Sequence, residues 1–168
     1  YYFGENTSLI IASIAIGIFG AFGAIALKAG VSEMTRLLHD WLFGAKRSIL
    51  VLAIPTAGIL LSVLFTRWWL KGDLGRGLPA VLNDVRENKG VIAAHKMYSQ
   101  VITSILTMGA GGSAGLEAPI ASTGAAWGSN VARWLKFDEP TRQMLLACGA
   151  AAGISAIFNA PIAGAIFA

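Results

Sequence analysis

The chain is too apolar for an ordinary soluble domain: 55% of its 168 residues are hydrophobic, 13% are charged, and the mean hydropathy is +0.65. Its apolar residues form continuous runs without strand-like alternation, which favours an all-α polytopic membrane protein over a barrel. The net charge of +4 comes from basic residues between these runs. There they meet lipid headgroups, so membrane lipids are expected partners and nucleic acid is not.

Four regions are long enough to cross a hydrocarbon core of about 30 Å, which takes about 20 helical residues. The first two are residues 6–27 and 48–66, and Pro55 predicts a kink in the second. Residues 67–71 (RWWLK) are typical of an anchor at the membrane interface. A polar connector is expected between the two spans, with charged or ionisable residues Lys28, Glu33, Arg36, His39, Asp40, Lys46 and Arg47.

The third region, residues 97–132, is too long for one span. A glycine-rich stretch, 109–115, and then Pro119 predict a helix, a loop at membrane depth and a second helix over 119–135. The fourth region, 143–168, is interrupted in the same way at Asn159 and Pro161. Both long connectors, the one after the first span and the one over 67–96, carry lysine and arginine. Charge counting therefore leaves the orientation in the membrane open.

The two ends of the chain do not resemble natural termini, because it starts at Tyr1 without methionine and stops at Ala168 inside an apolar run. We expect residues 1–168 to be a fragment of a single transmembrane domain without a separate soluble domain. Cys148 is the lone cysteine, which predicts a packing residue and excludes an internal disulfide. Acids and histidines are not clustered at ligand spacing, so neither a metal nor a cofactor is expected.

Three stretches share one form: GRGLPAVL (75–82), LEAPIAS (116–122) and FNAPIAG (158–164). Each places a proline after a polar or glycine-rich break, and proline is well tolerated in the first turn of a helix. Two of the three lie within uncharged sequence, which predicts helices that begin inside the membrane. The residues expected to line an anion path at these helix starts are Gly75, Arg76, Gly77, Leu78, Pro79, Gly115, Leu116, Ala118, Pro119, Asn159 and Pro161.

A helix that begins at membrane depth directs unpaired N–H groups and about half a positive charge at its surroundings. If several such starts converge, they form an anion site without any fixed cation, from which the anion can also leave. The alternative is that each proline only marks a helix start and that Ser113, Asn159 or water caps the N–H groups.

Glu117 is the single acid in an otherwise uncharged stretch, and it stands close to the N-cap position of the second start. Acids inside membranes are costly and therefore functional candidates. An ionised carboxylate there competes with an anion for the same N–H groups. The hypothesis is that ionised Glu117 blocks the path and that protonation or displacement opens it. The alternative is that Glu117 is a plain N-cap.

These residues resemble the CLC family of voltage-gated chloride channels and chloride/proton antiporters. The similarity is closest over LLACGAAAGISAIFNAPIAGAIFA (145–168). GLEAP (115–119) resembles the family motif G-(K/R)-E-G-P, whose acid is the gating glutamate and matches Glu117. GRGLP (75–79) resembles the motif G-S-G-I-P, and order and spacing fit from about residue 48 onward.

The resemblance implies two inverted halves per subunit, with discontinuous, tilted helices whose starts converge on chloride near the membrane midplane. This chain corresponds to most of the first half. The resemblance also implies a non-enzymatic homodimer with one pore per subunit, a multi-pass protein placed in the cell (inner) membrane. It leaves open whether the protein is a passive channel or exchanges chloride for protons.

Three positions depart from the family motifs. Arg76 stands where the family usually has an anion-coordinating serine. A fixed cation there would strengthen anion binding or alter anion selectivity, unless the side chain points toward the aqueous side. Leu116 replaces a basic residue, and Ala118 replaces a glycine, which narrows the freedom of the gate. The backbone N–H groups of Gly77 and Leu78 remain available to the anion.

Two other classes of protein compete with this interpretation. GGSAG (111–115) matches G-x-S-x-G, so an intramembrane serine hydrolase would use Ser113, a residue that is otherwise a second-rank candidate for the pore loop. That pattern requires a preceding strand and a histidine within reach, while His39 and His95 lie in charged connectors. A purely structural scaffold is the other class. The GxxxG spacings at 124–128 and 149–153 predict tight helix contacts in either case.

Overall fold

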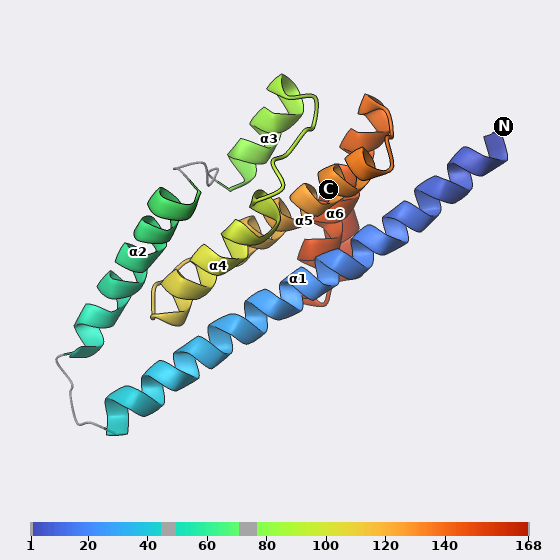
Figure 1. The fold of residues 1–168 in the computed structure, drawn as a ribbon. Helices are drawn as coiled ribbons and strands as arrows, with labels where there is room; N and C mark the ends of the chain where they lie inside the picture. Colours follow the sequence, from blue (N-terminus) through green and yellow to red (C-terminus); the bar gives the residue numbers. More distant parts are fainter. Residues whose placement is uncertain (1, 45–49, 71–76, 168) are drawn as a thin grey trace.

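The computed structural model describes residues 2–44, 50–70 and 77–167, and the burial of side chains over 7–40, 53–70 and 77–167. All regular secondary structure in these ranges is α-helical, as the sequence predicts. In chain order the helices are α1 (Tyr2–Gly44), α2 (Leu50–Trp69), α3 (Leu78–Glu87), α4 (Lys96–Gly109), α5 (Glu117–Trp134), α6 (Glu139–Phe158) and α7 (Pro161–Phe167) (Figure 1).

Helix α1 is one continuous helix of 43 residues, so the predicted polar connector is wrong over residues 28–44. The stretch after Leu27 lacks proline and contains many residues that favour helix, such as Glu33, Met34 and Leu37, so nothing local ends the helix before Gly44. Gly30, which does not favour helix, packs against the side chain of Ile105 on α4. A Cβ atom on residue 30 would collide with that side chain. The helix therefore continues through a polar sequence, because the residues there favour helix and Gly30 lies against α4.

The predicted breaks in the third and fourth regions are confirmed. Helix α4 ends at Gly109, residues 110–116 are irregular, and α5 begins at Glu117. At 14 residues, α4 is about 21 Å long, which is shorter than the hydrocarbon core of about 30 Å. The second break lies between α6 and α7, where Asn159 adopts the left-handed conformation (φ 53°) as the C-cap of α6.

Two of the described helical segments are long and apolar enough to cross a membrane by length and composition: Thr7–Asp40 and Glu139–Phe158. Ala53–Trp69, the part of α2 whose side chains the structure describes, is apolar as well, and the whole of α2 has 20 residues. The first and second predicted spans correspond to α1 and α2, and the third and fourth regions are each divided into two helices. The shorter helices belong to the regions that glycine and proline interrupt.

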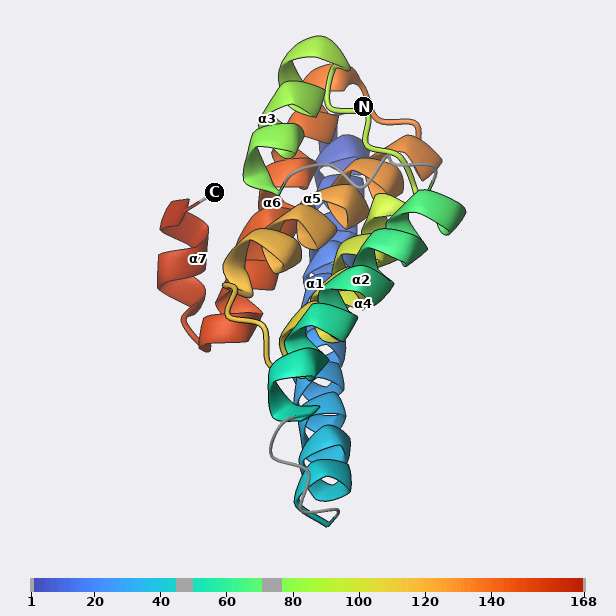
Figure 2. The same cartoon turned by 90° about the vertical axis from the view of Figure 1, so that its left-hand side faces the viewer.

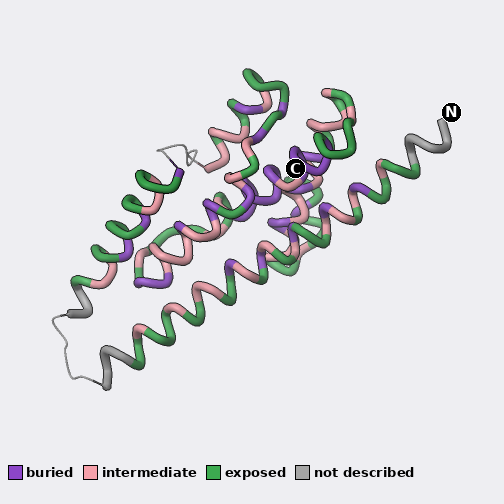
Figure 3. Tube along the Cα trace, in the orientation of Figure 1, coloured by how far each residue is buried: buried purple, intermediate pink, exposed green. Residues whose placement is uncertain are grey.

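Helix α5 is the centre of the described fold and packs against α1, α4 and α6 (Figures 1 and 2). Most of its length is buried, which Figure 3 shows as a purple segment between its neighbours. The predicted GxxxG contacts are confirmed, because a Cβ on Gly124 would collide with the backbone carbonyl of Gly149. A Cβ on Gly128 would collide with the carbonyl of Leu145 in the same way. Helix α5 therefore holds a fixed position against α6.

Candidate site at two helix starts

The starts of α3 and α5 lie against each other. A Cβ placed on Gly77, the N-cap of α3, would lie 3.4 Å from the Cβ of Ala118 in the first turn of α5. From this contact both helices run toward the upper part of the molecule as drawn in Figures 1 and 2. The positive ends of their two dipoles therefore meet at one place.

Several N–H groups at this meeting point have no acceptor among the residues that the structure describes. Ala80 N–H bonds to the carbonyl of Gly77 (3.2 Å), and Ile120 N–H bonds to that of Leu116 (3.1 Å). Pro79 and Pro119 carry no N–H. Neither helix has a side-chain cap. Within the described part of the chain, the backbone donors of Gly77 and Leu78 and those of Leu116, Glu117 and Ala118 therefore have no acceptor.

Two of the three predicted starts thus come together. They bring Gly77, Leu78 and Pro79 of the first motif to the second motif, which contributes Gly115, Leu116, Glu117, Ala118 and Pro119. Gly75 and Arg76 lie outside the described residues.

Glu117 is the first residue of α5, and Leu116 is the N-cap, one position earlier than the acid. The exposed carboxylate of Glu117 folds back over Gly115, where a Cβ atom would collide with it. It accepts no hydrogen bond and forms no ion pair with the residues that the structure describes. The predicted capping bond is therefore not formed, and the N–H groups of α5 are left to another acceptor.

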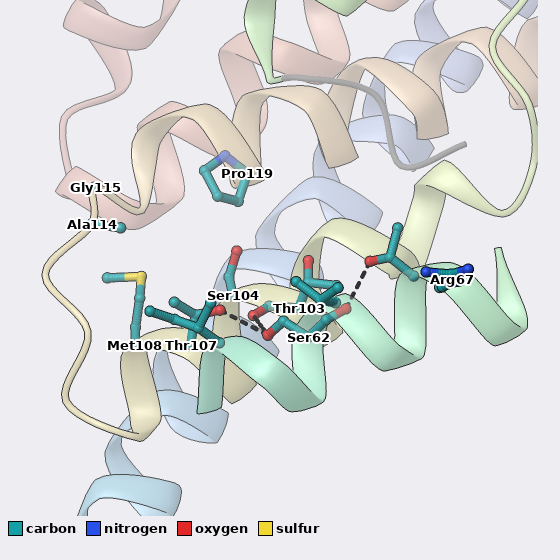
Figure 4. A pocket seen from close by; sticks show the side chains of 12 residues that line it. Ser62, Arg67, Thr103, Ser104, Thr107, Met108, Ala114, Gly115 and Pro119 are labelled. Atoms are coloured by element: carbon teal, nitrogen blue, oxygen red, sulfur yellow. Dashed lines mark hydrogen bonds between the residues drawn. The ribbon is translucent and has the colours of Figure 1, made fainter. Parts of the chain in front are cut away.

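A cavity of about 750 Å³ opens between α2, α4 and the start of α5 (Figure 4). Gly115 and Pro119 line it on the α5 side. Its residues on α2 and α4 include Ser62, Thr66, Thr103, Ser104 and Thr107, together with Arg67 at one end.

Most of the hydroxyl groups around this cavity are already paired within the protein. Ser62 Oγ donates to the carbonyl of Thr103 or Gly58 and lies 2.8 Å from Thr107 Oγ1. The hydroxyl of Ser104 makes no hydrogen bond with the described residues. Sequence reasoning missed the hydroxyl groups of this cavity, although the spacing of Thr103 and Thr107, four positions apart on an apolar helix, was a usable signal.

The third predicted start, at Asn159 and Pro161, does not join the other two. Helix α7 packs against α6, with Gly164 seated on Ser155 and Ala151. The residue of α7 that shares a small cavity of about 240 Å³ with Leu78 is Phe167, at the opposite end of the helix. The start of α7 is therefore directed elsewhere, because packing on α6 reverses the direction of the chain at this turn.

The hydrolase alternative is contradicted by the elements that surround Ser113. Ser113 follows helix α4, where the nucleophile elbow requires a strand. His95 is the N-cap at the far end of α4, about 21 Å of helix away from Gly109. Cys148 lies partly buried on α6 without a disulfide, as expected of a packing residue.

Comparisons with known proteins agree with this architecture. The family model described as voltage gated chloride channel matches residues 58–168. The chain is 34% identical to a putative chloride channel protein ClcB-like of Ralstonia nicotianae, over 90% of this chain and 38% of that protein. It is 36% identical to an H(+)/Cl(-) exchange transporter ClcA of Yersinia pestis, over 55% of this chain and 20% of that protein.

A solved structure shares the fold as well. The crystal structure of a slow cyanobacterial Cl-/H+ antiporter superposes with a TM-score of 0.75 at 25% identity, covering 93% of this chain and 38% of that one. The chain thus spans less than half the length of these relatives. Because the family model matches more than half of the chain, the chain belongs to the voltage gated chloride channel family.

Proposed function

We propose that this chain supplies one side of a pore for chloride or a similar small anion, with the anion held at the starts of α3 and α5. The observation that carries the proposal is the contact between Gly77 and Ala118, which gathers unpaired N–H groups from two helices. Amide donors and helix dipoles stabilise an anion without a formal cation. Such a site binds the anion weakly enough to release it, as conduction requires.

We propose Glu117 as the gate of this pore. Its own N–H is one of the unpaired groups, and its carboxylate lies over Gly115, a residue that lines the cavity between α2 and α4. Rotation of this side chain moves the carboxylate from its place over Gly115 to the N–H groups. There it occupies the place of the anion. Protonation removes the charge that competes with the anion, so acid favours the open path.

The cavity between α2 and α4 is proposed as a vestibule of this pore. Gly115 and Pro119 form part of its wall, so whatever fills the cavity reaches the segment that carries Glu117. The unpaired hydroxyl of Ser104 gives water or an anion one donor within it.

Exchange of chloride for protons is the second candidate, and it is favoured by two relatives whose names describe such exchange. In that case Glu117 also carries the proton. Measuring proton movement together with chloride flux separates the two: a chloride gradient drives protons uphill through an exchanger and not through a channel.

Three features of the assembly are part of the same proposal. The chain forms the first of two inverted halves, crosses the cell membrane several times and pairs as a homodimer. Support comes from the apolar helices, from the length of the relatives and from the exposed apolar residues of α7, such as Ile162 and Ile166.

The test is chloride flux from liposomes that contain the full-length protein, measured across a range of external pH. Glu117→Gln is expected to remove most of the pH dependence, because the amide cannot ionise. Glu87→Gln, at an exposed carboxylate that bonds to Asn83, is the matched control and is expected to keep it. Unchanged pH dependence in Glu117→Gln would show that the acid has no gating role.

A further inference from the structure

Helix α3 is short and lies at the edge of the described fold, yet its start must stay beside α5 for the proposed site to exist (Figure 1). Near the start, its contact with α5 is limited to small and apolar groups, such as Gly77 with Ala118. Contacts of this kind resist separation but are not directional, so they allow sliding and rotation. The directional contacts of α3 lie at its other end.

Asp84, in the last turn of α3, is the first member of that polar group. Its carboxylate accepts hydrogen bonds from Lys96 Nζ and Asn88 Nδ2, both at 3.0 Å. The ion pair with Lys96 is largely buried, with 14% and 12% of the two side chains exposed. The backbone carbonyl of Asp84 accepts from the N–H groups of Asn88 (3.1 Å) and Gly90 (2.9 Å). Asp84 thus ties the end of α3 to the following turn and to the start of α4.

Ser129 and Asn130 of α5 hold the same turn from the other side. Ser129 Oγ donates to the carbonyl of Gly90 (2.6 Å) and accepts from Ile92 N–H (3.0 Å). Asn130 Nδ2 donates to the carbonyl of Ile92 (3.2 Å). Both side chains are at least 98% buried, so water does not compete for these bonds. A continuous series of buried polar contacts therefore links the far ends of α3 and α5.

We infer that Asp84, Lys96 and Ser129 act as positioning residues that set the start of α3 beside the start of α5, and so set the affinity and anion preference of the site. The inference rests on the proposed anion function. The reason is that a helix is rigid, so directional bonds that hold one end of α3 also determine where its other end lies. Buried polar contacts are suited to this task because they are strong only in one geometry.

The first measurement is chloride flux by the full-length protein in liposomes, analysed as KM and maximal rate, together with the chloride-to-nitrate preference. Ser129→Ala removes two bonds without leaving a buried charge, and Asp84→Asn removes the ion pair. Each is expected to raise the KM for chloride about tenfold, the size expected for losing one strong hydrogen bond, and to lower the preference. The double variant Asp84→Asn/Lys96→Gln, which restores a neutral hydrogen-bonding pair, is expected to recover part of the loss.

Lys89→Met is the matched control. Lys89 lies in the same turn as Gly90, and its ion pair with Glu139 of α6 is exposed, with 73% and 43% of the two side chains exposed. Removing this ion pair is expected to leave the KM for chloride and the anion preference unchanged. Thermal unfolding in detergent identifies variants that remain folded. Folded Ser129→Ala and Asp84→Asn proteins with the KM and preference of the parent would overturn the inference.

A second measurement does not depend on transport. Spin labels at Leu82 on α3 and Leu135 after α5, both exposed, report the distance between the two helices in a Cys148→Ser background. The distance distribution is expected to broaden or shift in Ser129→Ala and to stay unchanged in Lys89→Met. An unaltered distribution in Ser129→Ala would contradict the inference that Ser129 positions α3. Absence of anion flux in the parent protein, with the distance shift present, would instead contradict the proposed function.

Discussion

The carboxylate of Glu117 lies over Gly115, in the space that a side chain at position 115 would occupy. Glycine at this position therefore leaves room for the side chain two residues later, which an alanine would have to displace. This relationship joins the segment that lines the cavity to the acid proposed as the gate.

Gly115→Ala is expected to displace the Glu117 carboxylate from its place over the loop. The displaced carboxylate then has the N–H groups of α5 as its nearest donors, so chloride flux at neutral pH is expected to fall and acid is expected to restore it. Flux from liposomes at two pH values measures this. Gly17→Ala on α1, where a Cβ meets nothing within 4 Å, is the control. Equal flux in both variants at both pH values would show that the position of the carboxylate does not control the path.

Gly124→Ala is expected to destabilise the protein by about 1–3 kcal/mol, because the added methyl group meets backbone atoms of α6 that cannot rotate away. Gly17→Ala is again the comparison, and it is expected to be neutral or slightly stabilising, since alanine favours helix by about 1 kcal/mol over glycine. Thermal unfolding in detergent measures both. A transition temperature of Gly124→Ala at or above that of Gly17→Ala would show that the two helices can separate without cost.

Ser104→Phe is expected to fill part of the cavity between α2 and α4 and to reduce maximal chloride flux severalfold without unfolding the protein. The reason is steric, since the lining includes the wall formed by Gly115 and Pro119. Ser32→Phe places the same side chain on the exposed surface of α1 and is the control. Full flux through Ser104→Phe would exclude the cavity from the anion route.

Arg76→Ser introduces the serine that the family motif G-S-G-I-P has at this position. It is expected to change the relative flux of chloride, nitrate and fluoride. A fixed cation adds attraction that depends on charge density, whereas a hydroxyl group adds one directional donor. Flux of the three anions under equal gradients measures the change. If the three ratios match those of the parent protein, the side chain of Arg76 lies outside the path.

The breaks in the helices were predictable because their causes are local. Pro79 and Pro119 lack an N–H and have a restricted φ, so each marks a helix start wherever the chain goes next. The glycine-rich stretch after Gly109 predicts the loop for the same kind of reason. The resemblance in these motifs also identified the family before any geometry was known.

Which starts meet was not predictable, because direction in space depends on residues far apart in the chain. The same proline signal at Pro161 begins a helix that packs on α6 and brings its last residues, not its start, beside Leu78. Polarity predicted a break after Leu27, whereas packing of Gly30 against Ile105 accompanies a helix that continues to Gly44.

The sequence by itself determined the membrane class of this protein, the positions of its helix breaks and the placement of one acid at a helix start. Only the tertiary structure decided that Gly77 meets Ala118, that a cavity opens beside Gly115, and that Ser129 holds a turn 37 to 39 residues earlier in the chain. The physical reason is range: backbone restrictions act within one turn of helix, while close packing and buried hydrogen bonds depend on how distant segments come together.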